Sequence, residues 1–424
     1  MQKSRKDENK QKEFISAKER EVLALVSQAL FGENCPVPSQ GDENLDWQSL
    51  YEECRQQAVP IITYGGVQKK KMPQNIEQQW KKTVIANTYN NFQVTYDHLK
   101  VHEMMQKAGV PYVILKGCAS AEYYPKPLER AMGDVDFLVK KEDMEKAGSV
   151  LKAQGFVPWE QEHICHVVYR KDSSHLEMHF EPAGIPYGKA GERIREYLEN
   201  IMDQAREIQV EGGTLMVPSA FHHGLILLLH TSHHLVGEGI GLRHLCDWAV
   251  FAASLSDSEF TGIFEEKLKA VGLWEFAQLI TQTCIHYLNA PYRKWVGEEK
   301  PELIAGIMAD IFSGGNFGRK DKSRVHESYL ISNRGKNGVG HSSILGQFFA
   351  SMNEVVRTNL PKSRKYPVLL PVGWCYYGGR YFLRMIRGKR PVIHIGKTVE
   401  GAVTRKELYR EFQLFEGESE SAGE

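Results

Sequence analysis

The sequence of 424 residues predicts an α+β fold, in which a small mixed sheet is embedded in N-terminal and C-terminal helical regions. Three observations lead to this prediction. Helical periodicity covers the chain up to about residue 107 and returns after Pro218. Between these regions, two short apolar runs alternate with short helical segments. Two alternating segments then follow one another, as paired strands do. The combination indicates a compact α/β unit enclosed by helices.

The N-terminal region begins with a polar stretch that we expect to be frayed. Ser16 followed by Glu19 has the spacing of a helix-capping box, which predicts that the first helix starts there. Residues 45–65 are expected to form further short helices. A long helix is predicted over 75–107, ending at Gly109, because glycine readily takes the left-handed conformation that closes a helix.

The central region changes period. The apolar runs PYVIL and VDFLV predict two buried strands, and two segments with period-two alternation predict two more, joined by a Lys-Asp-Ser-Ser turn. Short helices fill the connections. In chain order, the expected elements are a strand over 111–115, a helix over 118–123, a strand over 135–139, a helix over 142–154, and strands over 163–170 and 175–181.

The remaining chain is mainly helical. Apolar residues at helical spacing predict helices over 221–234, 242–255, 260–270, 273–288 and 302–312, and again over 344–357 and 374–386. We therefore divide the chain into an N-terminal helical region (1–94), an α/β core (95–215), a helical domain (216–312), a basic glycine-rich loop (313–343), a C-terminal helical region (344–415) and a disordered acidic tail (416–424).

The composition excludes several classes of protein. The 53 Lys and Arg residues balance 53 Asp and Glu residues, which argues against a surface built to coat nucleic acid. Seven cysteines without C-x-x-C spacing fit free thiols in a reducing compartment. The charged N-terminus lacks the apolar stretch of a signal peptide, and no apolar run reaches the length of a membrane helix. We expect a cytoplasmic protein.

Candidate chemistry begins with the carboxylates of the strand over 135–139. Alternation places Asp134 and Asp136 on one face, and Gly133 before them permits close approach of a ligand. Glu177 alternates away from the core on a later strand and can complete a carboxylate triad. Such a triad suits one or two Mg²⁺ ions, which prefer oxygen ligands. A lone D-x-D pattern more often belongs to a solvated charged face than to a metal site, so the order of the surrounding motifs matters.

That order resembles a known family. Leu115-Lys116-Gly117, then Tyr124-Pro125, Arg130, the run Gly133 to Val139, and Glu177-Met178-His179 are similar to the pattern of an uncharacterised bacterial nucleotidyltransferase family within the DNA polymerase β-like superfamily. Leu242-Arg243 and Asp247-Trp248 match the helical region that follows. The resemblance is sharp over about 70 residues and diffuse over about another 200, and the first 90 residues carry no recognisable motif.

The resemblance implies Mg²⁺-dependent transfer of a nucleoside monophosphate, AMP being expected, from an NTP to an acceptor hydroxyl with release of pyrophosphate. It implies that Asp134, Asp136 and Glu177 are catalytic metal ligands, in a two-ion site that Mn²⁺ can also fill. Nucleotide contacts are expected from six residues: Lys116, Gly117, Arg130, Gly133, His179 and Arg243. Where the wider superfamily has Gly-Ser, this chain has Lys116-Gly117-Cys118, so a lysine charge replaces a hydroxyl contact.

Other interpretations of the same residues stay open. The fold can persist in an inactive nucleotide-binding or regulatory module, or the acceptor can be a protein or RNA rather than a small molecule. A metal-dependent hydrolase using His175, Glu177 and His179 is a further alternative. His230 and His234 can line a pocket or simply pack, and Arg243 can pair with Asp247 at i, i+4.

Two basic segments have both a functional and a structural interpretation. The loop over 313–343 can close over a triphosphate or can be a connector. The basic aromatic stretch over 364–390 suits a membrane surface, although a packed helix with a basic edge is favoured.

Overall fold

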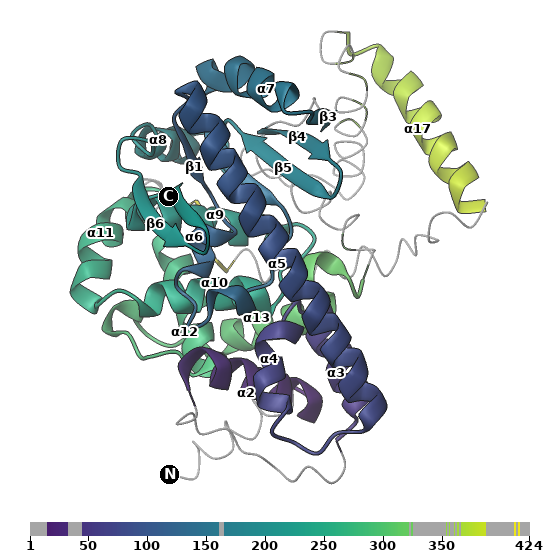
Figure 1. Cartoon of the computed structure of the whole chain (residues 1–424), viewed down its shortest axis with the longest axis vertical. Coiled ribbons are helices and arrows are strands. Elements are labelled where there is room, and N and C mark those ends of the chain that lie inside the picture. The colour runs from purple at the N-terminus through teal and green to yellow at the C-terminus, as the bar shows by residue number, and fades with distance from the viewer. Residues whose placement is uncertain are drawn as a thin grey trace.

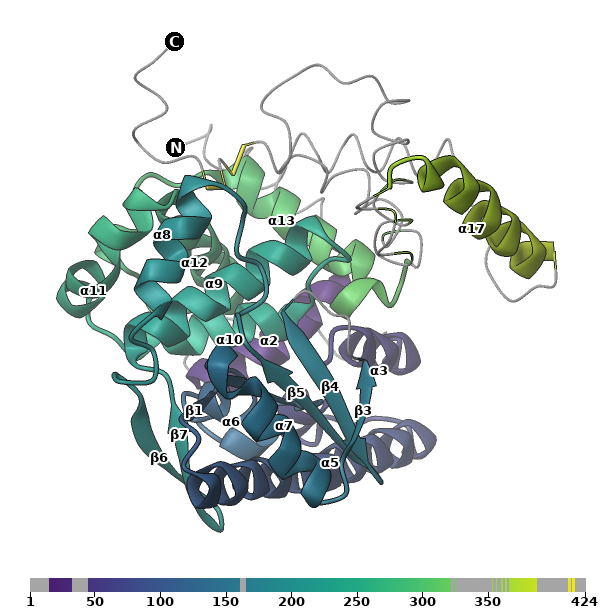
Figure 2. The ribbon, with the colours of Figure 1, turned by 90° about the horizontal axis from the view of Figure 1, so that it is seen from above.

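The computed structural model describes residues 15–32, 45–160 and 165–321, residues 366–386, and residues 324, 353, 356, 360, 363, 411, 412, 414 and 415. It confirms the α+β fold, with a five-stranded mixed sheet enclosed by helices (Figure 1). Seen from above, the sheet lies between α5 and α7 on one side and the helices α9 to α13 on the other (Figure 2).

The described residues of the N-terminal part form the helices α2 (Ala17–Phe31), α3 (Trp47–Gln56), α4 (Pro60–Val67) and α5 (Gln74–Ala108). The predicted capping box is present, because the Ser16 side chain accepts from the Glu19 N–H and the Glu19 side chain accepts from the Ser16 N–H. The predicted end of the long helix is also confirmed: Gly109 has φ 58° and ψ 44°, in the left-handed region.

Helix α5 connects the two halves of the structure. Its 35 residues span roughly 50 Å at 1.5 Å per residue. Its N-terminal part packs on α3 and α4, and it also packs on α7 (Met144–Ala153), on two strands of the sheet and on β7 (Gly213–Val217) (Figure 1). The division expected between residues 94 and 95 therefore falls inside one continuous helix.

The sheet contains β1 (Tyr112–Ile114), β2 (Val135–Val139), β3 (Val157–Glu160), β4 (His166–Lys171) and β5 (Ser174–His179), in the order β1-β2-β5-β4-β3. Only β2 and β5 run parallel; the other neighbours are antiparallel. The short helix α6 (Cys118–Ala121) and the 3₁₀ turn η2 (Pro127–Glu129) connect β1 to β2. The strand expected over 163–170 begins at His166, and residues 163 and 164 lie outside the described residues.

The sequence did not predict every element. Strand β3, helix α8 (Lys189–Leu198) and the hairpin of β6 (Arg206–Val210) with β7 were missed. The hairpin has a local signal, because Glu211-Gly212 separates two alternating segments and Gly212 has φ 96°.

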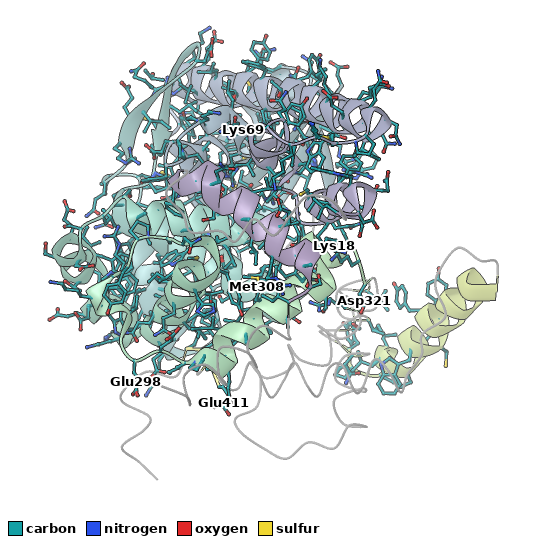
Figure 3. The ribbon with its side chains drawn as sticks, turned by 90° about the horizontal axis from the view of Figure 1, so that it is seen from below. Lys18, Lys69, Glu298, Met308, Asp321 and Glu411 are labelled. Atoms are coloured by element: carbon teal, nitrogen blue, oxygen red, sulfur yellow. The ribbon has the colours of Figure 1, made fainter. Side chains whose placement is uncertain are left out.

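The two faces of the sheet belong to different hydrophobic clusters. Val135, Phe137 and Val139 of β2 pack in one cluster with residues of α5, α7, β5 and β7. Leu138 points the other way, into a second cluster formed by the N-terminal helices and by the helices after residue 190. Figure 3 draws the side chains from below and labels Met308, a fully buried member of this cluster. Residues with the orientation of Leu138, Asp136 among them, therefore face the helical part.

The helical part confirms the predicted periodicity. It comprises α9 (Ala220–Val236), α10 (Leu242–Ala253), α11 (Asp257–Ala270), α12 (Trp274–Leu288), the turn η4 (Lys294–Val296), α13 (Pro301–Gly314) and the turn η5 (Asn316–Gly318). Helix α17 (Leu369–Ile386) contains the helix expected over 374–386. The tail over 416–424, nearly all of the helix expected over 344–357 and most of the loop over 313–343 lie outside the described residues.

Two further expectations concern the cell compartment. Six cysteines lie within the part of the chain that the structure describes, and all of them are free thiols. Among the same residues, no helix combines the length and apolar character needed to cross a membrane. Val372 and Tyr376 of α17 are exposed, and contact of this segment with a membrane surface stays a prediction.

Candidate functional site

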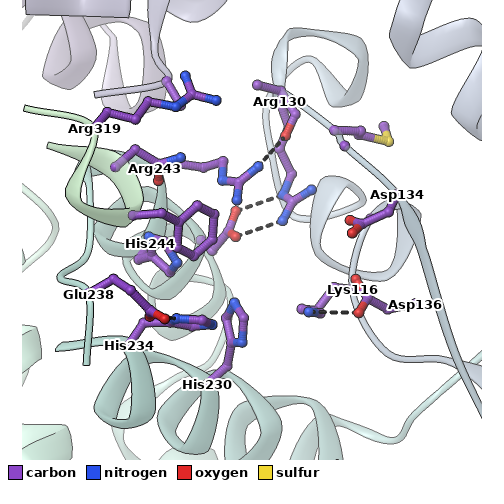
Figure 4. Close-up of a pocket in the computed structure, with 18 of the residues that line it drawn as sticks. Lys116, Arg130, Asp134, Asp136, His230, His234, Glu238, Arg243, His244 and Arg319 are labelled. Atoms are coloured by element: carbon purple, nitrogen blue, oxygen red, sulfur yellow. Dashed lines mark hydrogen bonds and ion pairs between the residues drawn. The ribbon is translucent and has the colours of Figure 1, made fainter. Parts of the chain in front are cut away.

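A cavity of about 980 Å³ lies between the sheet and the helical part. One wall carries Lys116, Asp134 and Asp136, and the facing wall carries histidine and arginine side chains from α9, α10 and the segment around η5 (Figure 4). Of the nine residues predicted to act in the site, all nine line this cavity: Lys116, Gly117, Arg130, Gly133, Asp134, Asp136, Glu177, His179 and Arg243.

The carboxylates come together through strand pairing. Parallel strands β2 and β5 place Asp136 directly beside Glu177, and alternation points both away from the cluster that holds Phe137 and Met178. Asp134 immediately precedes β2 and also lines the cavity. The neighbouring-strand arrangement that the sequence predicted for the third carboxylate is therefore what the structure has.

Asp136 is almost fully buried and makes two charged contacts. Its Oδ1 atom lies 2.8 Å from Lys116 Nζ and 3.0 Å from His179 Nε2. Burial alone would raise the Asp136 pKa, but Lys116 and His179 together hold it well below its ordinary value. The same contact acts on His179: burial opposes its charge, yet the hydrogen bond to Asp136 raises the His179 pKa to about 10. Asp136 is thus an anion at neutral pH.

Asp134 behaves differently. Burial and the negative charge of Asp136 raise the Asp134 pKa to about 6. For Glu177, burial raises the pKa, but the hydrogen bond from His179 outweighs it and the pKa is lowered. Three carboxyl groups withdrawn from water at one wall create a strong negative potential that a bound cation would relieve.

The donor set fits a divalent cation. Asp136, Glu177 and His179 offer ligand atoms that all lie within 4.8 Å of one another. Asp134 lies outside this cluster but adds a further oxygen donor to the same wall. Lys116 already places a positive charge against Asp136. Carboxylate oxygens are the donors that Mg²⁺ and Mn²⁺ prefer.

The alternative hydrolase site is not assembled as expected. Within the described residues, His175 does not join Glu177 and His179 in a common ligand cluster. His166 of β4 lies there instead, with its Nε2 atom 3.9 Å from Glu177 Oε2. The reason is strand pairing, because β4 places His166 opposite His179 while His175 lies opposite Arg170.

The facing wall is built from α9, α10 and the segment around η5. His234 Nδ1 lies 3.1 Å from Glu238 Oε2, and the ring of Phe317 packs on both His234 and His244. Burial keeps the pKa of His230 and that of His244 well below the usual histidine value, so both rings are neutral. This wall offers neutral imidazole groups in place of a carboxylate cluster.

Arg243 is the buried cation of this wall. Its Nη1 atom donates to the Ala131 carbonyl at 3.4 Å, and its guanidinium lies 5.5 Å from the centre of the Phe317 ring. Burial, followed by the positive charge of Arg130, lowers the Arg243 pKa. No carboxylate within the described residues forms a salt bridge with Arg243. An anionic ligand would supply the missing counter-charge.

Arg130 is held in a bidentate ion pair with Asp247 of α10. Its Nε and Nη2 atoms donate to the two Asp247 oxygens at 2.7 Å each, and the Tyr124 hydroxyl donates to Oδ1 at the same distance. Helix spacing alone would suggest Arg243 as the partner of Asp247. In the structure, Asp247 pairs with Arg130 instead. The pair fixes the segment before β2 against α10, and the role of Arg130 as a phosphate contact stays a prediction.

The same segment is clamped by α5. The fully buried Asn91 donates to the carbonyls of Leu128 and Arg130 at 2.7 and 2.8 Å and accepts from the Met132 N–H at 3.0 Å. Asn90 donates to the Met132 carbonyl at 2.8 Å. Sequence reasoning missed this clamp, although two asparagines inside a long helix are a signal because asparagine is a weak helix former.

The two glycines of the site differ in whether the fold requires them. Gly117 has φ 61°, and a Cβ atom there would lie 2.6 Å from His98 Nε2, so the fold itself requires glycine. Gly133 has neither constraint, since a Cβ atom added there would meet no atom within 4 Å. Gly133 borders the cavity, and the absence of a side chain leaves room beside Asp134.

Several cavity residues had not been singled out from the sequence. They are His166, Glu238 and His244, which come from β4, the segment after α9, and α10. Local periodicity carries no signal for such residues, because their common location arises only when β4, α9 and α10 pack together. Phe317 and Arg319, in contrast, belong to the loop that was expected to reach a ligand.

Comparison with known proteins agrees with this geometry. No curated protein and no solved structure matched the chain. The model of a family described as uncharacterised nucleotidyltransferase matches residues 43–289, which is more than half of the 424 residues. The matched range contains the carboxylate strands, Lys116 and the Arg130–Asp247 pair. On this evidence the chain belongs to the uncharacterised nucleotidyltransferase family and is a transferase enzyme.

Proposed function

We propose that this protein transfers a nucleoside monophosphate, AMP in the first instance, from an NTP to an acceptor hydroxyl with Mg²⁺ as cofactor. The acceptor is a small molecule, a protein or an RNA. The single observation that carries the proposal is the pairing of Asp136 with Glu177 on a sheet face that lines the cavity, opposite the buried guanidinium of Arg243.

The metal ligands in this proposal are Asp134, Asp136 and Glu177. When bound, Mg²⁺ or Mn²⁺ neutralises phosphate charge and polarises the phosphorus that is attacked. The chain's own residues prepare this wall: Lys116 and His179 keep Asp136 ionised, and the register of β2 and β5 keeps Glu177 beside it.

In the transfer itself, the acceptor oxygen forms a bond to the α-phosphorus while the bond from that phosphorus to the bridging oxygen breaks. Pyrophosphate leaves with that electron pair. The hydroxyl proton passes to a carboxylate, for which Glu177 is proposed. Lys116 and Arg243 balance charge on the triphosphate from opposite walls, and Arg319 extends the positive wall. The neutral rings of His230 and His244 leave the arginine charges as the main attraction.

The test is label transfer by the purified chain. The chain is incubated with Mg²⁺, each of four labelled NTPs in turn, and cell extract as the source of acceptor. We expect transfer that is strongest with ATP, that stops with chelator and that returns with Mg²⁺ or Mn²⁺. Absence of NTP binding by calorimetry, with and without Mg²⁺, would refute the proposal.

Matched variants assign the carboxylates. Asp134→Asn is the sharper test, because Asp134 forms no salt bridge within the described residues whose loss would disturb folding. Asp136→Asn leaves Lys116 and His179 without their common partner, so its thermal unfolding must be measured alongside activity. Asp203→Asn is the control, since this exposed carboxylate does not line the cavity. Transfer is expected to be lost in the first two variants and kept in the third.

A further inference from the structure

Beside the carboxylate wall, a thiol and two imidazoles meet at the start of β4 and the end of β5. Cys165 immediately precedes β4, and the antiparallel register places His166 opposite His179 with ring centres 4.8 Å apart. The Phe180 N–H donates to the Cys165 carbonyl at 3.0 Å, which fixes Cys165 beside the end of β5. Cys165 and His179 are buried and His166 is half-buried, and the ligand atoms of the three residues lie within 4.8 Å of one another.

The two imidazoles are oriented alike. His179 turns Nε2 to Asp136, at 3.0 Å, and His166 turns Nε2 towards Glu177 Oε2, at 3.9 Å. The opposite nitrogen of His166, Nδ1, lies 3.6 Å from Cys165 Sγ. Within the described residues, the buried Nδ1 atom of His179 has no hydrogen-bond partner of normal geometry, although the Cys165 thiol acts on the same ring. A buried nitrogen left in this way beside a thiol and a second imidazole points to a ligand that it binds.

We propose that Cys165, His166 and His179 form a binding site for a zinc-like transition metal, separate from the carboxylate site. One sulfur and two imidazole nitrogens are the donors that Zn²⁺ prefers and Mg²⁺ avoids. Three protein ligands leave the fourth tetrahedral position open, as in catalytic zinc sites. Neighbouring ligand atoms around tetrahedral zinc are about 3.5 Å apart, so the Cys165–His166 separation already fits.

The carboxylates complete the arrangement. A histidine that binds a metal through one nitrogen almost always donates its other N–H to a carboxylate or carbonyl, which fixes the ring. Asp136 occupies that position for His179, at 3.0 Å, and Glu177 lies near both rings, with its Oε2 atom 3.5 Å from His179 Nε2 and 3.9 Å from His166 Nε2. A metal on Nδ1 of His179 would in turn fix Nε2 as the hydrogen-bearing nitrogen, donating to Asp136. The site would thereby orient the two carboxylates to which the proposed function assigns the nucleotide-bound Mg²⁺.

The experiment measures metal binding on the full chain, so its result is independent of nucleotide transfer. The chain is purified under reducing conditions, stripped with chelator and titrated with Co²⁺ as a spectroscopic substitute for Zn²⁺. We expect one equivalent to bind with a thiolate-to-cobalt charge-transfer absorption, and Zn²⁺ to displace it. Cobalt that binds without this absorption, or no stoichiometric binding of either metal, would overturn the proposal.

Variants separate this site from the carboxylates. Cys165→Ser should abolish the charge-transfer absorption. Cys118→Ser is the matched control, because Cys118 is also buried beside a histidine, His98, but belongs to no cluster of three metal-binding groups within the described residues; it should keep the absorption. Glu177→Gln removes only an outer partner, so it should keep the absorption and weaken Co²⁺ binding about 10–100-fold. Binding lost in Asp136→Asn but unaffected in Cys165→Ser would assign the metal to the carboxylates and refute the proposal.

Discussion

Lys116 and Asp136 form an ion pair at the edge of the cavity, with 2.8 Å between Nζ and Oδ1. Lys116 lies just beyond the end of β1, and Asp136 lies on β2. The antiparallel pairing of these two strands brings the two side chains together. Burial would lower the Lys116 pKa, but Asp136 and then Asp134 raise it. Under the proposed function, the ammonium would compete with a divalent cation for the same carboxylate, and we expect it to turn to phosphate when nucleotide and metal bind together.

The first prediction follows from this competition. Lys116→Met should increase the affinity for Mn²⁺ alone by about tenfold, about 1.4 kcal/mol, and should weaken binding of the Mn²⁺–NTP complex. Calorimetry on the free chain measures both constants. Lys126→Met is the control, because Lys126 is an exposed lysine paired with Glu129 outside the cavity. Equal Mn²⁺ affinity in Lys116→Met and the unaltered chain would contradict the competition.

The second prediction concerns the buried pair of Arg130 and Asp247. Asp247→Asn leaves the guanidinium without its counter-charge and should lower the free energy of unfolding by about 3–5 kcal/mol. Tyr124→Phe removes only one hydrogen bond to Asp247 and should cost about 1 kcal/mol. Urea unfolding compares the two variants. Similar losses in both would mean that the ion pair adds little beyond an ordinary hydrogen bond.

The third prediction is the pH dependence of the same pair. Burial raises the Asp247 pKa, but Arg130 outweighs it and the folded-state pKa is lowered below the unfolded value of about 3.9. The stabilisation is therefore complete above the unfolded pKa and is lost as pH falls through the folded pKa. The difference in unfolding free energy between the unaltered chain and Asp247→Asn should be constant from about pH 7 to 5 and should shrink below about pH 4. A difference that grew on acidification would have the wrong sign.

The fourth prediction separates the two glycines of the site. Gly117→Ala should destabilise the fold, because the backbone has a positive φ and the new methyl group would collide with His98. Gly133→Ala should leave the unfolding temperature within about 2 °C, since its Cβ meets no atom and a change within about 0.5 kcal/mol is expected at such a position. It should nonetheless weaken NTP binding if a ligand lies against this backbone. Full NTP affinity in a folded Gly133→Ala variant would remove Gly133 from the binding site.

The fifth prediction tests the asparagine clamp. Asn91→Ala removes three hydrogen bonds to the segment that precedes Asp134 and should cost about 1–3 kcal/mol for each buried group left without a partner. Asn90→Ala removes one bond and should cost less. If the clamp positions Asp134, the rate of label transfer at saturating nucleotide should fall more in Asn91→Ala than in Asn90→Ala, measured where both variants are folded. Equal rates would limit Asn91 to a stabilising role.

Much of the fold could be predicted because its signals are local. The Ser16–Glu19 capping box, Gly109 at the end of α5 and the alternation of β2 and β5 each depend on residues a few positions apart. The short strand β3 and the hairpin of β6 and β7 were missed. Strands of four or five residues bury little surface of their own, and their pairing partners decide whether they form.

The candidate site could be predicted only in part. Alternation was enough to place Asp134, Asp136 and Glu177 away from the core, and helical spacing was enough to raise Arg243 as a candidate. Spacing alone suggested that Asp247 pairs with Arg243. Asp247 pairs instead with Arg130, which lies 117 residues away along the chain. Long side chains choose partners across packed elements, and that choice depends on distances that periodicity does not encode.

The sequence by itself therefore determined which residues face the cavity wall from each strand, because side-chain direction follows directly from the period of the strand. Only the tertiary structure decided which groups meet: Lys116 with Asp136, Asn91 with the segment before β2, and Cys165 with His166 and His179. These contacts arise when β1, β4 and α5 pack against the carboxylate strands. Burial then determines the free energy that each contact contributes, because charges and hydrogen bonds withdrawn from water interact far more strongly than the same groups at the surface.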